Sequence, residues 1–296
     1  MELSKALDSL PTTCLMVIKD GKTVYEYGDP TEVSYLASVR KSILSLLYGR
    51  PVTDGVITLQ STLEDLGIDD VQGLLPRERR ATVHDLLTGR SGVYHPAASP
   101  TGLEALLPER GTVEPGTEFH YTAWDANALG TIYERQTGRR VFDAVAEDLA
   151  GPLGFQDFDP ARQRLLGRPE ISRHLAHHLF LSARDLARIG LLVLAGGRGL
   201  VPRQWLTQSL TPYAKNYGYQ WWLPRLSQGQ AFMSIGNFGQ FLLGVPERDL
   251  VVVHRVAVPD ELAIARNNAG ADVAIQGVTH SEFARIGQLI LRSDWA

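Results

Sequence analysis

The sequence has little cysteine, little lysine and no long apolar run. Cys14 is the only cysteine among 296 residues, so an intrachain disulfide is impossible and a reducing compartment is expected. No apolar run reaches the length of a membrane span, and the first nine residues, which include Asp8 and Ser9, lack the apolar core of a signal peptide. We therefore expect a cytoplasmic protein that does not bind a membrane.

The charge balance lacks the basic excess that is typical of nucleic-acid-binding proteins. Formal net charge is −4, and no low-complexity tract or internal repeat interrupts an ordinary globular composition. The length suits one large domain or two closely packed ones. A small molecule is therefore the expected partner, and nucleic acid is not.

Strand patterns lie at both ends of the chain and helical patterns in the middle. An apolar run at 12–19, the turn pair Asp20-Gly21 and an alternating run at 22–27 predict a β-hairpin. Further strands are predicted at 217–223, 230–235, 240–245 and 250–258, and helices at 84–88, 126–136, 141–150, 182–194 and 279–291.

These patterns predict an α/β (α+β) fold with an antiparallel sheet built from both termini and flanked by helices. Residues 1–54 and 201–296 would form the sheet region, and residues 55–200 an inserted, mostly helical region. The two parts would act as one catalytic unit, with the site in a cleft between them.

The first chemical motif is Ser38-Val39-Arg40-Lys41, at the start of a predicted helix. A serine hydroxyl needs a base within hydrogen-bond reach to become a nucleophile at neutral pH. Residues three apart share one face of a helix, so Lys41 can serve as that base if burial and nearby positive charge lower its pKa. The Ser38 N–H, at the helix start, is also available to an oxyanion.

Two later motifs supply further groups for this chemistry. Tyr121 ends a loop at 115–121 and can relay a proton between nucleophile and leaving group. The stretch from Ser234 to Gln240 is a glycine-rich strand edge, where Gly236 lets a backbone approach a ligand closely. Ile235 is a candidate for a second oxyanion donor through its backbone N–H.

In order and spacing, these three motifs resemble those of the serine β-lactamase and penicillin-binding-protein superfamily. The resemblance is greatest to class C β-lactamase-like esterases and the 6-aminohexanoate-dimer hydrolase group. Segments 82–92, 151–155, 182–190 and 245–253 are also similar to segments of that superfamily, so the likeness covers about residues 12–292.

This resemblance implies a β-lactamase/transpeptidase-like fold and acyl transfer without a cofactor or metal. Ser38 would be the acylated nucleophile, Lys41 the base and Tyr121 the proton relay. The backbone N–H groups of Ser38 and Ile235 would form the oxyanion hole.

Two departures from the family pattern bear on the substrate. Ala123 stands where the family has an asparagine that holds the substrate amide, and Ser234 where a lysine or histidine attracts the substrate carboxylate. Both weaken the case for penicillins and favour a small neutral ester or amide. Arg40, Arg255 or His254 could still supply a positive charge.

Each of the expected pocket residues also suits a packing role. We expect Ser234, Gly236, Trp124, His178 and Phe238 to line the substrate pocket. Three close histidines at 174, 177 and 178 suggest a metal, but no accompanying ligand pattern supports one, and we predict none.

The predicted function is a serine hydrolase, either a carboxylesterase or an amidase. A β-lactamase or a linear amide-oligomer hydrolase uses the same machinery. A non-catalytic protein that binds an acyl ligand is the alternative of another class. The sequence does not distinguish hydrolysis from acyl transfer, and it identifies neither the deacylation base nor the oligomeric state.

Overall fold

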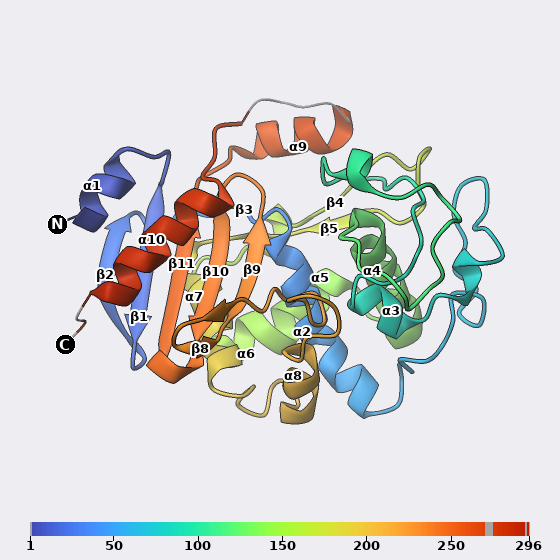
Figure 1. Cartoon of the computed structure of the whole chain (residues 1–296), viewed down its shortest axis with the longest axis horizontal. Coiled ribbons are helices and arrows are strands. Elements are labelled where there is room, and N and C mark those ends of the chain that lie inside the picture. Colours follow the sequence, from blue (N-terminus) through green and yellow to red (C-terminus); the bar gives the residue numbers. More distant parts are fainter. Residues whose placement is uncertain (1, 270–274, 294, 296) are drawn as a thin grey trace.

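A five-stranded antiparallel sheet forms from the two ends of the chain. The computed structural model describes residues 2–269, 275–293 and 295. The strands lie in the order β2-β1-β11-β10-β9 (Figure 1). Their bounds are β1 Cys14–Lys19, β2 Lys22–Gly28, β9 Phe232–Gly236, β10 Gln240–Val245 and β11 Leu250–Arg255. The prediction of one antiparallel sheet built from both termini is confirmed.

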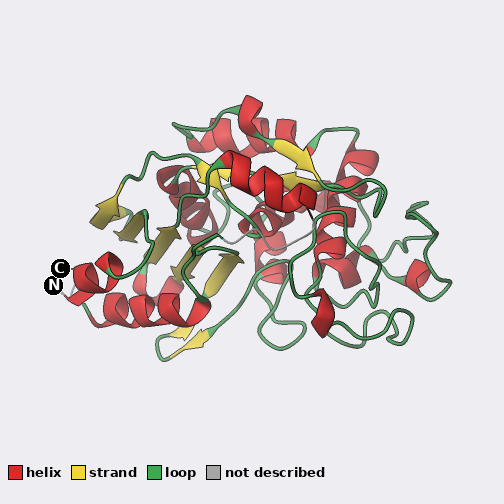
Figure 2. Cartoon of the chain, turned by 90° about the horizontal axis from the view of Figure 1, so that it is seen from above, coloured by secondary structure: helices red, strands yellow, loops and turns green. Residues whose placement is uncertain are grey.

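Both faces of the sheet are covered, which explains why its inner strands are apolar at consecutive positions. On β1, Leu15 and Val17 pack toward α1 (Glu2–Asp8) and α10 (His280–Arg292), while Met16 and Ile18 belong to the larger core on the other face. Figure 2 shows helices on both sides of the strands.

Between the two sheet-forming ends, the chain carries short helices that are joined by long loops. Its elements are α3 Val83–Leu87, α4 Ala123–Thr137, α5 Val141–Ala144, a π-helical segment Val145–Ala150, α6 Gly151–Leu153, α7 Ala183–Leu194 and α8 Arg203–Ser209. Three two-stranded pairs accompany them: β3 Ser34–Tyr35 with β6 Phe180–Leu181, β4 Arg164–Leu166 with β5 Ala176–His178, and β7 Arg225–Leu226 with β8 Gly229–Gln230. Although α7 falls within the predicted helical region, it packs against β1, β10 and β11.

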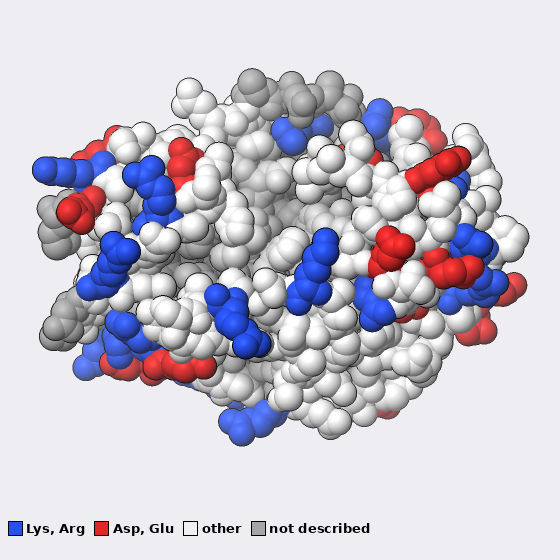
Figure 3. Space-filling view, viewed as in Figure 1, with Lys and Arg blue, Asp and Glu red and all other residues white. Residues whose placement is uncertain are grey.

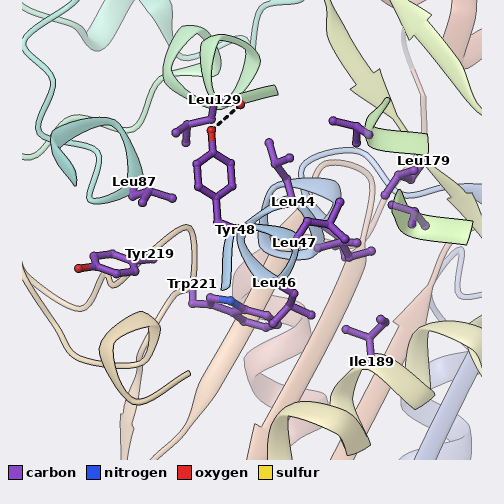
Figure 4. Close-up of a cluster of buried hydrophobic side chains, with 14 of the residues drawn as sticks. Leu44, Leu46, Leu47, Tyr48, Leu87, Leu129, Leu179, Ile189, Tyr219 and Trp221 are labelled. Carbon is purple, nitrogen blue, oxygen red and sulfur yellow. Dashed lines mark hydrogen bonds between the residues drawn. The ribbon is translucent and has the colours of Figure 1, made fainter. Parts of the chain in front are cut away.

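Helix α2 (Val39–Thr53) runs between the sheet and the helices α3 and α4 (Figure 1). Its residues from Val39 to Gly49 are all buried, so the helix is enclosed on every side. The Tyr48 hydroxyl donates to the Leu129 carbonyl on α4 at 2.6 Å, in the middle of the apolar cluster of Figure 4. Among the described residues, no helix is both long and apolar enough to cross a membrane.

Two elements differ from the sequence prediction. Residues 217–223 were expected to form a strand, and this is wrong: they form turns with isolated bridges from Tyr217 to Trp222 and from Trp222 to Met233. Gln220 has a φ of +62° and breaks the extended course. Helix α9 (Asp260–Ala269) was not predicted, and it lies above the site in Figure 1.

The close packing of β9 and β10 gives a stability prediction. A methyl group at Gly244 would lie 2.0 Å from the Phe232 ring, whereas one at Gly287 on α10 would meet nothing within 4 Å. We expect Gly244→Ala to lower the free energy of unfolding by about 1–3 kcal/mol through overpacking. Gly287→Ala should raise it by about 0.5–1 kcal/mol through the helix preference for alanine. Thermal or denaturant unfolding measures both, and equal effects would contradict this packing.

Candidate active site

The segment before Ser38 is held by a buried arginine. The Arg255 guanidinium donates to the carbonyls of Leu181 at 2.8 Å and Ser34 at 3.0 Å, and to the Gln240 side chain at 2.6 Å. Ala37, just before Ser38, has a φ of +48°, a sparsely populated conformation for a residue with a Cβ. The sequence analysis named Arg255 as a candidate positive charge for the substrate. In the structure, its guanidinium instead bonds to groups inside the fold.

Ser38 is the N-cap of α2, yet its hydroxyl makes no capping hydrogen bond. Its side chain is half-buried and lines a pocket. Within the described part of the chain, no acceptor takes the Ser38 N–H, while the next N–H groups bond back to Leu36 and Ala37. Both the hydroxyl and the N–H of Ser38 are therefore available to a ligand.

Lys41 lies one turn along α2 and is buried. Its Nζ donates to the Thr122 carbonyl at 3.0 Å and lies 3.8 Å from the centroid of the Tyr121 ring. Burial lowers the pKa of the Lys41 ammonium well below its ordinary value, and the neighbouring Arg40 charge lowers it further. This shift favours the neutral amine, the form that can accept a proton.

Tyr121 completes a cluster with Ser38 and Lys41. Its hydroxyl lies close enough to the Ser38 side chain for the two to interact. Burial raises the pKa of the Tyr121 phenol, partly offset by this interaction and by Arg40, so the side chain is a neutral phenol. Thr122, the next residue, caps α4 by accepting the Asp125 N–H at 3.1 Å. The structure therefore brings the three predicted catalytic side chains together.

Strand β9 passes closely beside the residues before Ser38. A Cβ at Gly236 would lie 2.5 Å from the Leu36 carbonyl oxygen, so this approach requires glycine. Ser234 is buried beneath α2, where its hydroxyl accepts from Ser42 at 2.8 Å. Ser234 does not line the pocket that holds Ser38.

On its outer edge, β9 carries backbone N–H and C=O groups that are not hydrogen-bonded to β10. Met233 exchanges hydrogen bonds with Trp222 on that edge, at 2.7 and 2.9 Å. Since residues alternate along an antiparallel strand, the N–H of Ile235 points to the same edge, and that of Asn237 follows. Asn237 lines the pocket with Ser38, whereas the Ile235 side chain packs in the core on the α10 side.

The pocket beside Ser38 lies between α2, β9 and α9, and Figure 3 shows the hollow on this face of the molecule. Its lining comes from six separate stretches of chain: Tyr35, Ala37, Ser38, Arg40, Lys41, Ser99, Pro100, Thr101, Ala123, His178, Asn237, Phe238, Arg266 and Asn267. Ser99 donates to Asn267 on α9 at 2.6 Å and lies 3.3 Å from His178 Nε2. Burial lowers the pKa of the His178 imidazole well below its ordinary value, so the ring is neutral.

Other residues singled out in the sequence lie elsewhere. Trp124 donates to Asp70 at 2.7 Å within the helical region, and His254 lies 2.9 Å from the Thr12 hydroxyl. His174 and His177 contact Thr131 and Glu134 separately. In residues 2–269, 275–293 and 295, no group of three or more His, Cys, Asp or Glu side chains is placed to hold a metal.

Sequence reasoning missed Ser99, Thr101, Asn237, Arg266 and Asn267. None of these lies in a motif with a chemical signature, except that Asn237 falls inside the glycine-rich edge. They reach Ser38 only because 99–101 and α9 fold over it.

Comparison with known proteins agrees with this architecture. A curated 6-aminohexanoate-dimer hydrolase of Paenarthrobacter ureafaciens is 25% identical over 309 residues, covering 88% of this chain and 76% of that protein. A Bacillus anthracis structure assigned as a 6-aminohexanoate-dimer hydrolase superposes with a TM-score of 0.71 at 22% identity, covering 97% of this chain and 81% of the other. A penicillin-binding protein from Bacillus halodurans gives a TM-score of 0.69 at 17% identity, covering 98% and 99%.

The fold is thus the β-lactamase/transpeptidase fold that the sequence motifs predicted. The family model described as Beta-lactamase matches residues 3–273, which is most of the chain. This chain therefore belongs to the beta-lactamase family of hydrolases.

Proposed function

We propose that this protein is a serine hydrolase that forms an acyl-enzyme on Ser38 and cleaves small esters or amides. The observation that carries the proposal is the buried Lys41 amine, whose pKa is lowered beside the Tyr121 ring and Ser38. A lysine serves as a base only when its environment favours the neutral form, and this environment does.

Acylation follows from the contacts of Ser38. Its Oγ attacks the substrate carbonyl carbon while the hydroxyl proton passes to Lys41, directly or through the neighbouring Tyr121 hydroxyl. The same proton then goes to the leaving oxygen or nitrogen as its bond to the carbonyl carbon breaks. A water molecule repeats the sequence to release the acid and restore Ser38.

The oxyanion of each tetrahedral intermediate needs two donors. The unpaired N–H of Ser38 is one. Along the outer edge of β9, Asn237 borders the pocket and Ile235 does not, so we assign the second donor to the Asn237 N–H in preference to that of Ile235.

The finer identity of the substrate is also a proposal. Ala123 lines the pocket at the family's amide-holding position, and Ser234 bonds to Ser42, so neither offers the groups that hold a penicillin. We place a small ester or amide first, and the linear amides of the named relatives second. We also propose the cytoplasm as its location, on the single cysteine, with neither nucleic acid nor membrane as a partner.

A fluorophosphonate probe tests the proposal directly. We expect intact-mass spectrometry to show one adduct per chain and peptide mapping to place it on Ser38, since such probes phosphonylate activated serines. Release of 4-nitrophenol from 4-nitrophenyl acetate should accompany it. Labelling at another residue would contradict Ser38 as the nucleophile, and the absence of both labelling and turnover would favour the non-catalytic binding protein.

A further inference from the structure

Three basic side chains border the pocket beside Ser38. Arg40 and Arg266 both line it, together with Lys41, and none of its described lining residues is an aspartate or glutamate. Arg266 comes from α9, and its guanidinium carbon lies 4.8 Å from the centroid of the Phe238 ring.

Arg40 is the more informative of the two cations. Its side chain is 5% exposed, and its Nη2 donates to the Asn127 Oδ1 at 2.7 Å, a neutral amide acceptor. No carboxylate within the described ranges lies close enough to pair with this guanidinium. A buried charge normally has an ionic partner, because desolvation without one is costly.

The amide of Asn127 adds a second unfilled donor next to Arg40. Its Nδ2 is buried and has no acceptor in the described part of the chain. Asn127 is itself buried and does not line the pocket, so a ligand there would meet the Arg40 guanidinium, and arginine binds carboxylates through two parallel N–H bonds.

The nearest acids, Glu104 and Asp125, are close enough to oppose the lowering of the Lys41 pKa, but each bonds within its own segment. Glu104 accepts the N–H groups of Thr101 and Gly102 at 2.6 and 2.8 Å, within its own turn. Asp125 accepts from the Ser91 hydroxyl at 2.6 Å, and burial raises the pKa of its carboxyl to about 7. Neither side chain borders the pocket.

We infer that Arg40 binds a carboxylate of the substrate, so that Ser38 acts on small esters or amides that carry a negative charge. This inference rests on the proposed function and narrows its substrate class. Arg40, the residue directly before Lys41, would then supply the positive charge that the family has at the position of Ser234, whose own hydroxyl bonds to Ser42 beneath α2.

Matched substrate pairs test the charge preference in the wild-type protein. One pair places the charge on the acyl side: mono-4-nitrophenyl adipate against the 4-nitrophenyl ester of adipic acid monoamide. The other places it on the leaving group: 4-acetoxybenzoate against 4-acetoxybenzamide. We expect kcat/KM to be about 10- to 100-fold higher for the anion in at least one pair, as for a hydrogen bond to a charged group.

Substitution of Arg40 tests its part in that preference. The ratio of kcat/KM within the preferred pair should fall to near one in Arg40→Gln and be partly retained in Arg40→Lys. The ratio is the readout because Arg40 also lowers the pKa of Lys41, so both substrates will slow together. Arg50→Gln, at an exposed position on the same helix, should keep the wild-type ratio.

The outcomes separate this inference from the proposed function. Hydrolysis and Ser38 labelling without preference for either anion would overturn the inference alone, as would an unchanged ratio in a folded Arg40→Gln. No hydrolysis of any of the four esters and no labelling would overturn both. If Arg40→Gln fails to fold, inhibition of the wild-type protein by adipate at constant ionic strength tests the inference instead. We expect competitive inhibition by adipate. Equal inhibition by chloride would contradict a carboxylate site.

Discussion

Ser38→Ala is expected to lower kcat by about 10⁴-fold or more and to abolish fluorophosphonate labelling. The change removes the only atom of this side chain that can bond to an acyl carbon. It should leave folding nearly unaffected, because the Ser38 hydroxyl does not cap α2. Stopped-flow or steady-state release of 4-nitrophenol measures the activity, and thermal unfolding measures the stability.

The same helix offers a matched control for that change. Ser45 is buried on α2, and its hydroxyl has no hydrogen-bond partner among the residues described. Ser45→Ala deletes the same atom and should keep both activity and labelling. Retention of more than a tenth of wild-type turnover in Ser38→Ala, with labelling intact, would mean that another residue is the nucleophile.

The parts of the fold that the sequence predicts are those with strong local signals. Asp20 and Gly21 both adopt positive φ, 51° and 73°, as a tight hairpin between β1 and β2 requires. Thr279 and Glu282 form the predicted capping box at the start of α10. Each is decided by hydrogen bonds within a few residues of chain.

The segments that differ from the sequence prediction depend on packing between parts of the chain that are far apart in sequence. Aromatic residues between 217 and 223 resemble a strand, yet Tyr217 and Trp221 are buried in turns that bond to the chain around Ser209 and Leu87. Helix α9 has a weak apolar pattern, since the described part of it buries only Ala263 and Asn267. Ala263 packs in one cluster with Tyr35, and Asn267 accepts a hydrogen bond from Ser99. Both Tyr35 and Ser99 are far from α9 in sequence.

The same contrast applies to the site. Spacing along one helix, together with the two later motifs, was enough to propose Ser38 and Lys41 as partners, because the geometry of a helical turn is fixed. Spacing could not reveal that Trp124 faces Asp70, or that Asn267 forms the pocket wall. Motifs therefore sufficed to propose the catalytic chemistry, whereas the proposed substrate preference rests on the tertiary structure around Arg40.

Lys41→Met is expected to lower kcat by about 10³- to 10⁴-fold, the range for losing a positioned general base. Methionine approximates the length of the lysine stem but cannot accept the Ser38 proton. In the wild-type protein, activity should fall as pH falls through the pKa of Lys41, because protonation removes the base. Burial and Arg40 lower that pKa, so the acid limb of the pH–kcat profile should lie well below the 10.5 of an exposed lysine.

A second substitution tests the cause of that lowered pKa. Arg40→Gln removes the positive charge beside Lys41 and should move the acid limb to higher pH, while Arg40→Lys should leave it nearer the wild-type position. Lys22→Met, on the exposed strand β2, serves as the control and should leave both kcat and the limb unchanged. A limb that stays in place in Arg40→Gln, or that persists in the residual activity of Lys41→Met, would show that a group other than Lys41 accepts the proton.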